Sequence, residues 1–197
     1  MSFTMAHTIL LPHPISKVFP ALSESQHMER LQKLTPEAQT FTLLPFDHVQ
    51  LPATGLASFS LPDHPKSAEG LPRPLTMEAI PANANVKNGH VVERVKFEFS
   101  GVATQLFGLV KSPISVSGAQ IVDTRSRTVL YESVEGAGLK ILKARTCEEV
   151  VMEDGKEGTK VKETVWGTCP VYLVWLVKMI APGLHQKAMD SYHNLFE

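Results

Sequence analysis

The last 28 residues constrain the fold most, because they form one long and mostly apolar stretch with helical spacing after a chain of strand patterns. At about 100° per residue, one arc of this stretch collects Leu184, Ala188, Met189, Tyr192, Leu195 and Phe196. A helix with an apolar stripe must bury that stripe against other structure. A sheet that curves around the helix supplies such a surface and often leaves a hollow, so the pattern predicts a cavity.

The terminal segment contains a break at Pro182-Gly183. Proline removes one backbone donor and clashes with the preceding turn. We therefore expect a kink there, or two helices that span Val171–Ile180 and Leu184–Phe196. The first piece is apolar nearly all round but too short to cross a bilayer, which takes about 20 residues.

That first piece is either buried or a contact surface for a membrane or a second subunit. Exposure of Tyr172, Trp175 and Leu176 would favour the contact surface, including a homodimer. His185 and Tyr192 lie on the apolar arc of the second piece. Both side chains are either core residues with satisfied polar tips or part of a ligand site.

Composition indicates one globular domain, residues 1–197, with 43% hydrophobic and 20% charged residues. A net charge of −1 and scattered basic residues argue against nucleic acid as a partner. The two cysteines, Cys147 and Cys169, fit a reducing compartment. The first residues lack the basic region of a signal peptide, and no apolar run reaches the length of an integral membrane segment. We expect a cytoplasmic protein.

The remaining chain reads as a strand, two short helices and then strands joined by short turns, which implies an antiparallel sheet of about six or seven strands. The helices are expected over Ile15–Leu22 and Glu24–Leu34. The strands are expected over Phe3–Leu11, Thr40–Leu51 with a break at Pro45, Val91–Ala103, Ser115–Val122, Thr128–Val134, Leu139–Met152 and Thr159–Thr168. Leu75–Ile80 is a short further candidate.

Strand 91–103 alternates most clearly. Arg94, Lys96, Glu98 and Ser100 are expected on a wet face, while Val95, Phe97, Phe99 and Gly101 are expected on a buried one. Glu93 extends the buried phase toward the strand end, where a carboxylate lies either at a solvated rim or inside a cavity. Residues 52–74 are rich in Pro, Gly, Ser and Ala, and are either a lid near the cavity mouth or a surface insertion.

Three stretches carry a family resemblance: residues 12–19 (PHPISKVF), 119–131 (AQIVDTRSRTVLY) and 158–165 (GTKVKETV). In order and spacing they resemble the START-like superfamily, also called SRPBCC, although Thr124 stands where that family often has proline. The resemblance implies an α+β helix-grip fold, in which a curved antiparallel sheet wraps around the C-terminal helix over an apolar cavity. Members of the family bind hydrophobic small molecules or lipids, and some are polyketide cyclases or dehydratases.

No nucleotide, hydrolase or zinc-protease motif is present, and the eight histidines show no metal-ligand spacing. We therefore expect no metal and no cofactor. His7 shares the phase of apolar residues on the first strand, and a buried neutral histidine can act as a base. Core packing is the alternative.

Two functions follow from these observations. The first is a cofactor-independent cyclase, isomerase or dehydratase for a hydrophobic molecule, polyketide- or terpenoid-like, with proton transfer by His7, Glu93, His185 or Tyr192. The second is a non-catalytic carrier for such a molecule or a lipid. In both, the ligand-binding residues are expected to be Phe97, Phe99, Tyr131 and Met189. Convergent polar groups in the cavity would favour the enzyme, and one polar anchor would favour the carrier.

Overall fold

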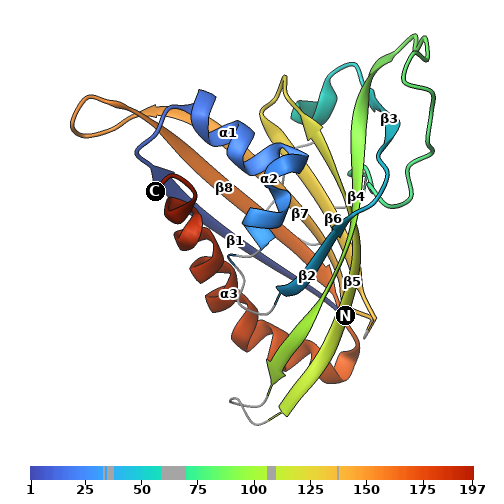
Figure 1. The fold of residues 1–197 in the computed structure, drawn as a ribbon, viewed down its shortest axis with the longest axis vertical. Helices are drawn as coiled ribbons and strands as arrows, with labels where there is room; N and C mark the ends of the chain where they lie inside the picture. The colour runs from blue at the N-terminus through green and yellow to red at the C-terminus, as the bar shows by residue number, and fades with distance from the viewer. Residues whose placement is uncertain (33, 35–37, 59–69, 106–109, 137) are drawn as a thin grey trace.

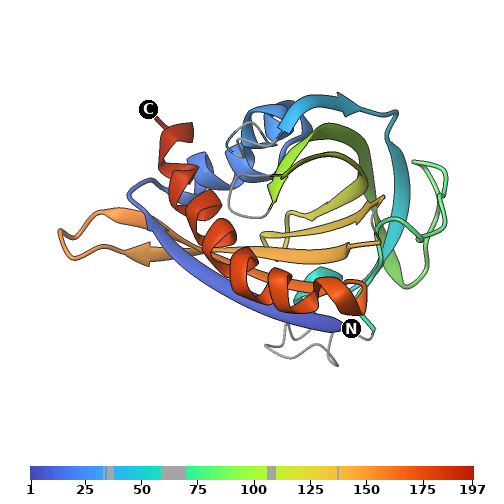
Figure 2. The same ribbon diagram turned by 90° about the horizontal axis from the view of Figure 1, so that it is seen from below.

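One curved antiparallel sheet organises the molecule, with the helices inside its curve (Figures 1 and 2). The computed structural model describes residues 1–32, 34, 38–58, 70–105, 110–136 and 138–197. Within them the strand order is β1-β8-β7-β6-β5-β4-β2, and β3 also pairs with β4. The strands are β1 Ser2–Leu11, β2 Ala38–Leu43, β3 Asp47–Pro52, β4 Gly89–Gln105, β5 Val110–Asp123, β6 Thr128–Glu135, β7 Lys140–Val151 and β8 Glu157–Thr168.

The helices are α1 Ile15–Ser23, α2 Ser25–Gln32 and α3 Val174–Asp190, with short 3₁₀ turns at η1 Gly55–Ser58, η3 Val171–Leu173 and η4 Ser191–Leu195. The α+β helix-grip prediction is confirmed. The prediction of two C-terminal helices is wrong, because α3 runs through Pro182. Buried contacts at Val174 and Met189, near its two ends, hold the helix in place. One lost backbone hydrogen bond does not end a helix that tertiary packing stabilises.

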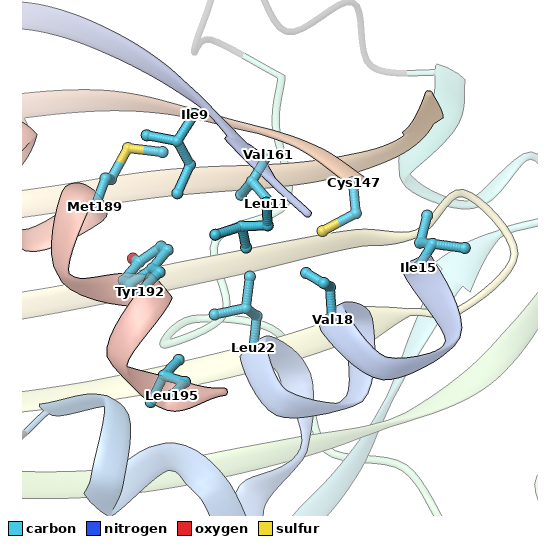
Figure 3. Close-up of a cluster of buried hydrophobic side chains, with 10 residues drawn as sticks. All are labelled: Ile9, Leu11, Ile15, Val18, Leu22, Cys147, Val161, Met189, Tyr192 and Leu195. Atoms are coloured by element: carbon cyan, nitrogen blue, oxygen red, sulfur yellow. The ribbon is translucent and has the colours of Figure 1, made fainter. Parts of the chain in front are cut away.

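The concave core joins β1, β7 and β8 to α1 and to the C-terminal end of α3. Figure 3 shows its side chains pointing toward one another between the sheet and the two helices. They are Ile9, Leu11, Ile15, Val18, Leu22, Cys147, Val161, Met189, Tyr192 and Leu195. This contact closes the gap between sheet and helix at that end of the molecule, so no hollow separates them there.

A second apolar layer covers the convex face of the sheet. Leu56 and Leu71 pack there with Val49 and Leu51 of β3 against the outward side chains of β5 to β8. The described parts of 52–74 therefore lie on the face opposite the helices, which does not fit a lid over the concave side; 59–69 lie outside the described residues. The strand expected at 75–80 is reduced to one bridge, between Ile80 and His48.

This second layer also overturns the expected exposure of Arg94, whereas Glu98 and Ser100 of the same face of β4 are exposed as expected. Arg94 is only 3% exposed, because it lies under the loop that follows Leu71 and donates to the carbonyl oxygens of Pro74 and Met77. The opposite phase is confirmed for Val95 and Phe97, which are buried toward α2. The ring of Phe97 lies over Gly118 of β5, where an added Cβ would come within 2.1 Å of the ring, so that position requires glycine.

Candidate functional site

An ion pair between Arg145 of β7 and Glu163 of β8 forms the centre of the concave face. The two residues lie opposite each other in the strand register, so their side chains share one face. The Arg145 Nε atom donates to Glu163 Oε1 at 2.5 Å, and the two residues are 3% and 1% exposed. Two buried charges are stable only when their remaining hydrogen-bonding groups are also satisfied.

Arg145 and Glu163 are satisfied by the two helical ends that meet above them. Arg145 Nη1 donates to the Leu22 carbonyl in the last turn of α1, where a cation also complements the helix dipole. Arg145 Nη2 donates to the Tyr192 hydroxyl at 2.8 Å, and this hydroxyl donates to Glu163 Oε1 at 2.7 Å. Tyr192 thereby connects η4 to both strands, and its hydroxyl both donates and accepts.

One histidine lies near the same carboxylate, and a second lies opposite Glu163 in the strand register. His185 Nδ1 of α3 lies 3.7 Å from Glu163 Oε2, and its Nε2 is buried without a hydrogen-bond partner. His7 lies opposite Glu163 in the β1–β8 register, and its Nε2 lies 3.4 Å from Asp190 Oδ1. Of the four predicted catalytic residues, His185 and Tyr192 therefore lie against Glu163, while His7 lies on the neighbouring strand and contacts Asp190.

Lys143 is the other cation of this cluster. Its Nζ lies 3.6 Å from Glu163 Oε2 and 5.0 Å from the centre of the Tyr131 ring, and its side chain is 22% exposed. Lys143, Tyr131 and Arg145 line a narrow cavity of about 10 Å³ beneath α2, together with Met28, Leu31, Gln32, Gln120 and Val129. This places an ammonium group and a phenol at the wall of one small space.

Burial and charge shift the pKa values of the cluster in opposite directions. Burial opposes the charge of Glu163, yet Arg145 and Lys143 together hold its pKa well below the usual range. Burial lowers the pKa of Lys143 and of His185, although Glu163 acts in the opposite direction on both. Burial raises the pKa of Tyr131 and of Tyr192. The cluster thus combines a carboxylate that stays ionised with a lysine and a histidine whose pKa values lie below their usual ranges.

A larger cavity, of about 690 Å³, lies elsewhere, between the α1–α2 corner and strands β4 and β5. Its apolar walls include Ile15 and Phe19 of α1 with Val91 and Val95 of β4, and its polar lining includes Glu24, Glu93 and Arg127. The volume falls in the range of small-molecule sites, about 300–1,000 Å³. The fourth predicted catalytic residue, Glu93, belongs to this cavity, four strands away from Glu163.

The residues predicted to bind ligand do not line that larger cavity. Phe97 is fully buried and stacks on Tyr131 with ring centres 5.0 Å apart, and Phe99 packs beside them, partly buried. Met189 is 0% exposed within the closed concave core. The larger cavity is therefore not the pocket expected from Phe97, Phe99, Tyr131 and Met189. Of these four residues, Tyr131 alone lines the narrow cavity.

Sequence reasoning missed Glu163 and Lys143. Both carry a signal in their strands, because Glu163 shares its phase with Val161 and Val165, and Lys143 with Ile141 and Cys147. A charged residue in an apolar phase indicates a buried partner or a site. Arg145 is visible in the sequence as a strand residue, but its inward direction needs the strand register.

Within the described ranges, no group of three or more His, Cys, Asp or Glu residues could hold a metal ion. No described helix combines the length and the apolar character needed to cross a bilayer.

Comparisons by sequence gave no match, neither among protein-family models nor among curated proteins. Solved structures do match over nearly the whole chain. A protein of Thermus thermophilus is similar with a TM-score of 0.56 at 12% identity, over 98% of this chain and 96% of that one. The Zhui aromatase/cyclase of Streptomyces has a TM-score of 0.53 at 8% identity, over 99% and 96%.

Norcoclaurine synthase of Thalictrum flavum, solved in complex with dopamine and hydroxybenzaldehyde, has a TM-score of 0.54 at 12% identity, over 100% of this chain and 87% of that one. Identities this low establish the fold alone. The helix-grip fold that the sequence resemblance implied is confirmed by these structures together with the strand order.

Proposed function

We propose that this chain binds a hydrophobic small molecule and converts it by acid–base chemistry without a cofactor, as a cyclase, isomerase or dehydratase in the cytoplasm. The observation that carries the proposal is the convergence of Lys143, His185 and Tyr131 around the Arg145–Glu163 pair. Arg145 already supplies one positive charge to Glu163. Lys143 is therefore a second cation at the same carboxylate, partly buried at 22% exposure, and a fold keeps such a group at a cost in stability.

The chemistry of these groups fits proton transfer. A lysine with a lowered pKa offers a neutral amine closer to neutral pH than a surface lysine does, and such an amine can accept a proton. The unpartnered Nε2 of His185 is a second group that can exchange a proton with a bound molecule. Tyr131 lies on the wall of the narrow cavity that Lys143 also lines. From there it can donate a hydrogen bond to an oxyanion that develops on the bound molecule.

The predicted residues take different roles in this proposal. Tyr192 is a positioning residue, because both functions of its hydroxyl are used within the Arg145–Glu163 network. His7 acts at a distance, through Asp190 and the charge near His185. Glu93 contributes to ligand entry or binding at the larger cavity. Two solved structures with this fold are an aromatase/cyclase and norcoclaurine synthase, which supports the reaction type.

The test starts from the protein purified from its own host. Native mass spectrometry identifies any bound small molecule, and chromatography with mass spectrometry then follows that molecule during incubation with fresh protein. We expect conversion by the wild type and a loss of about a hundredfold in turnover for Lys143→Met with the molecule still bound. Lys160→Met, a surface lysine that pairs with Glu148, is the matched control and should not change turnover.

A carrier is the second candidate, and the 690 Å³ cavity favours it. That cavity is large enough for a ligand and its walls hold the α1 and β4 apolar residues, while the lysine and histidines lie outside its lining. A bound molecule that wild-type protein returns unchanged, with binding reduced by substitution of Phe19 rather than Lys143, would select the carrier and reject the enzyme.

A further inference from the structure

Helix α3 has one face packed on the sheet and one apolar face exposed. Val174 packs with Phe3 and Val165, and Val177 lies against the same cluster. On the opposite side, Tyr172, Trp175 and Met179 are 72%, 64% and 53% exposed. They are three and four residues apart, so they share one face. Val171 and Ile180 extend this face, and the five residues are called the α3 apolar surface below.

The fold does not require these side chains to be apolar. The core contacts of α3 come from the other face, and the outward side chains contribute little to them. A tryptophan and a tyrosine exposed next to each other on a helix indicate a contact outside the chain. The exposed Tyr172 and Trp175 agree with the contact surface that the sequence left open, whereas Leu176, the third residue of that expectation, is only partly exposed.

The charges around the surface decide which contact fits. Lys178 and Lys187 are exposed and project about 90° to either side of the mean direction of Tyr172, Trp175 and Met179, at about 100° per residue. From Thr164 to Met189 the chain contains no Asp or Glu. Lys140 is exposed on β7 opposite Thr168, just before η3, and adds a third cation. An apolar stripe flanked by lysines complements an anionic surface.

A second copy of this chain fits the same surface poorly. In a two-fold dimer each copy presents the same patch to the other. The lysines beside one stripe would then face the lysines of the partner, with no carboxylate of α3 before Asp190 to oppose them. A bilayer has no such conflict, and Trp and Tyr side chains favour its interface because their rings are amphipathic.

We propose that the α3 apolar surface docks this protein on anionic lipid bilayers, with α3 lying in the plane of the interface and Trp175 inserted at headgroup depth. The docking is a property of the outward face of α3. It is independent of the Lys143 cluster and of any bound small molecule.

Trp175 is also the reporter for the test. The chain has two tryptophans, and Trp166 is 4% exposed beneath the convex layer, so a change in emission on lipid addition comes from Trp175. Vesicles of phosphatidylcholine with about 30% phosphatidylserine should shift the emission to the blue, and brominated lipids should quench it. Phosphatidylcholine alone, or salt at about 0.5 M, should abolish most of the shift, because screening removes the lysine contribution.

Substitutions distinguish docking through the α3 apolar surface from non-specific binding to the vesicles. By sedimentation with the anionic vesicles, Trp175→Ser should weaken partitioning about tenfold, and Lys178→Glu with Lys187→Glu should weaken it by a similar factor. Val151→Ser is the matched control, because Val151 is 80% exposed on β7, and it should change partitioning less than about twofold. Circular dichroism confirms that each variant is folded.

Two results would overturn the proposal. One is an emission spectrum and a sedimentation profile that vesicles of either composition leave unchanged. The other is a blue shift that appears without lipid as protein concentration rises, together with a dimer by light scattering, which would assign the surface to a second copy.

Discussion

The sheet has two buried arginines, one on each face, and the similar clusters around them have different roles. Arg94 on the convex face binds Asp47 through two hydrogen bonds, of 2.6 and 2.5 Å, and donates to the carbonyl oxygens of Pro74 and Met77. Arg145 on the concave face binds Glu163, the Leu22 carbonyl and Tyr192. Each arginine thus fastens a remote segment to the sheet.

The two clusters differ in the groups that surround the arginine–carboxylate pair. Asp47 is 24% exposed, and its further cation, Lys96, is 37% exposed, so water screens the convex cluster. Glu163 is 1% exposed and already pairs with Arg145. Lys143 and His185 also adjoin it, although the ion pair does not require their charges. The convex cluster contains the groups that attach the second layer, whereas the concave cluster also holds titratable groups without an evident role in packing. That surplus distinguishes a candidate site from a structural ion pair.

The largest expected effect is that of Glu163→Gln. This change leaves the buried Arg145 and the partly buried Lys143 without a carboxylate, and should lower the free energy of unfolding by about 3–5 kcal/mol. Urea denaturation of the variant and the wild type gives the difference. A cost below about 1 kcal/mol would mean that water already screens the concave cluster as it does the convex one.

Asp47→Asn should cost less, about 1–2 kcal/mol, because Asp47 itself and its second partner Lys96 are partly solvated. The loss should also depend on pH. Hydrogen bonds from Arg94 lower the pKa of Asp47 to about 2, whereas an aspartate in the unfolded chain has a pKa near 3.9. Its contribution is therefore present above about pH 4 and disappears as pH falls toward 2.

Unfolding curves from pH 6 to pH 2 should accordingly converge for Asp47→Asn and the wild type at the acid end. A gap that stays constant over this range would contradict the role of the carboxylate charge. Glu163→Gln serves as the comparison, since the lower pKa of Glu163 keeps its contribution in place to more acid pH.

Tyr192→Phe retains the ring but deletes the hydroxyl between Arg145 and Glu163. It should destabilise the fold by about 1–2 kcal/mol, since one buried donor of Arg145 loses its acceptor. If Tyr192 is a positioning residue, turnover should fall without a shift in the pH optimum. A lost limb of the pH–rate profile would instead assign proton transfer to the hydroxyl.

Lys143→Met should have the smallest effect on stability, within about 1 kcal/mol and in the stabilising direction, because it removes a cation beside Arg145. Burial lowers the pKa of Lys143, so its charge penalises the folded state below that pKa. Wild-type stability should therefore rise as pH approaches the unfolded value of about 10.4, and this rise should be absent in the variant. A loss of several kcal/mol in the free energy of unfolding would instead give Lys143 a structural role beside the Arg145–Glu163 pair.

Most of the fold could be predicted from local patterns. The strands on both sides of Asp154-Gly155 and the alternation of β4 appear in the structure within a few residues of their expected bounds. The positive φ of 80° at Gly155 is the turn that this dipeptide predicts. His185 and Tyr192 were placed on the inward arc of the last helix by spacing alone, and both lie within reach of Glu163.

The sequence by itself determined which side chains share a strand face or a helix arc, because these depend on periods of 2 and about 3.6 residues. Only the tertiary structure decided what covers each face. The strand pattern predicted a solvated Arg94, but in the structure Pro74 and Met77, about 20 residues away in the sequence, cover it. The role of Glu163 depends on its contacts with Arg145, 18 residues earlier, and with Tyr192, 29 residues later. Burial and pairing depend on contacts between distant segments, which no local period encodes.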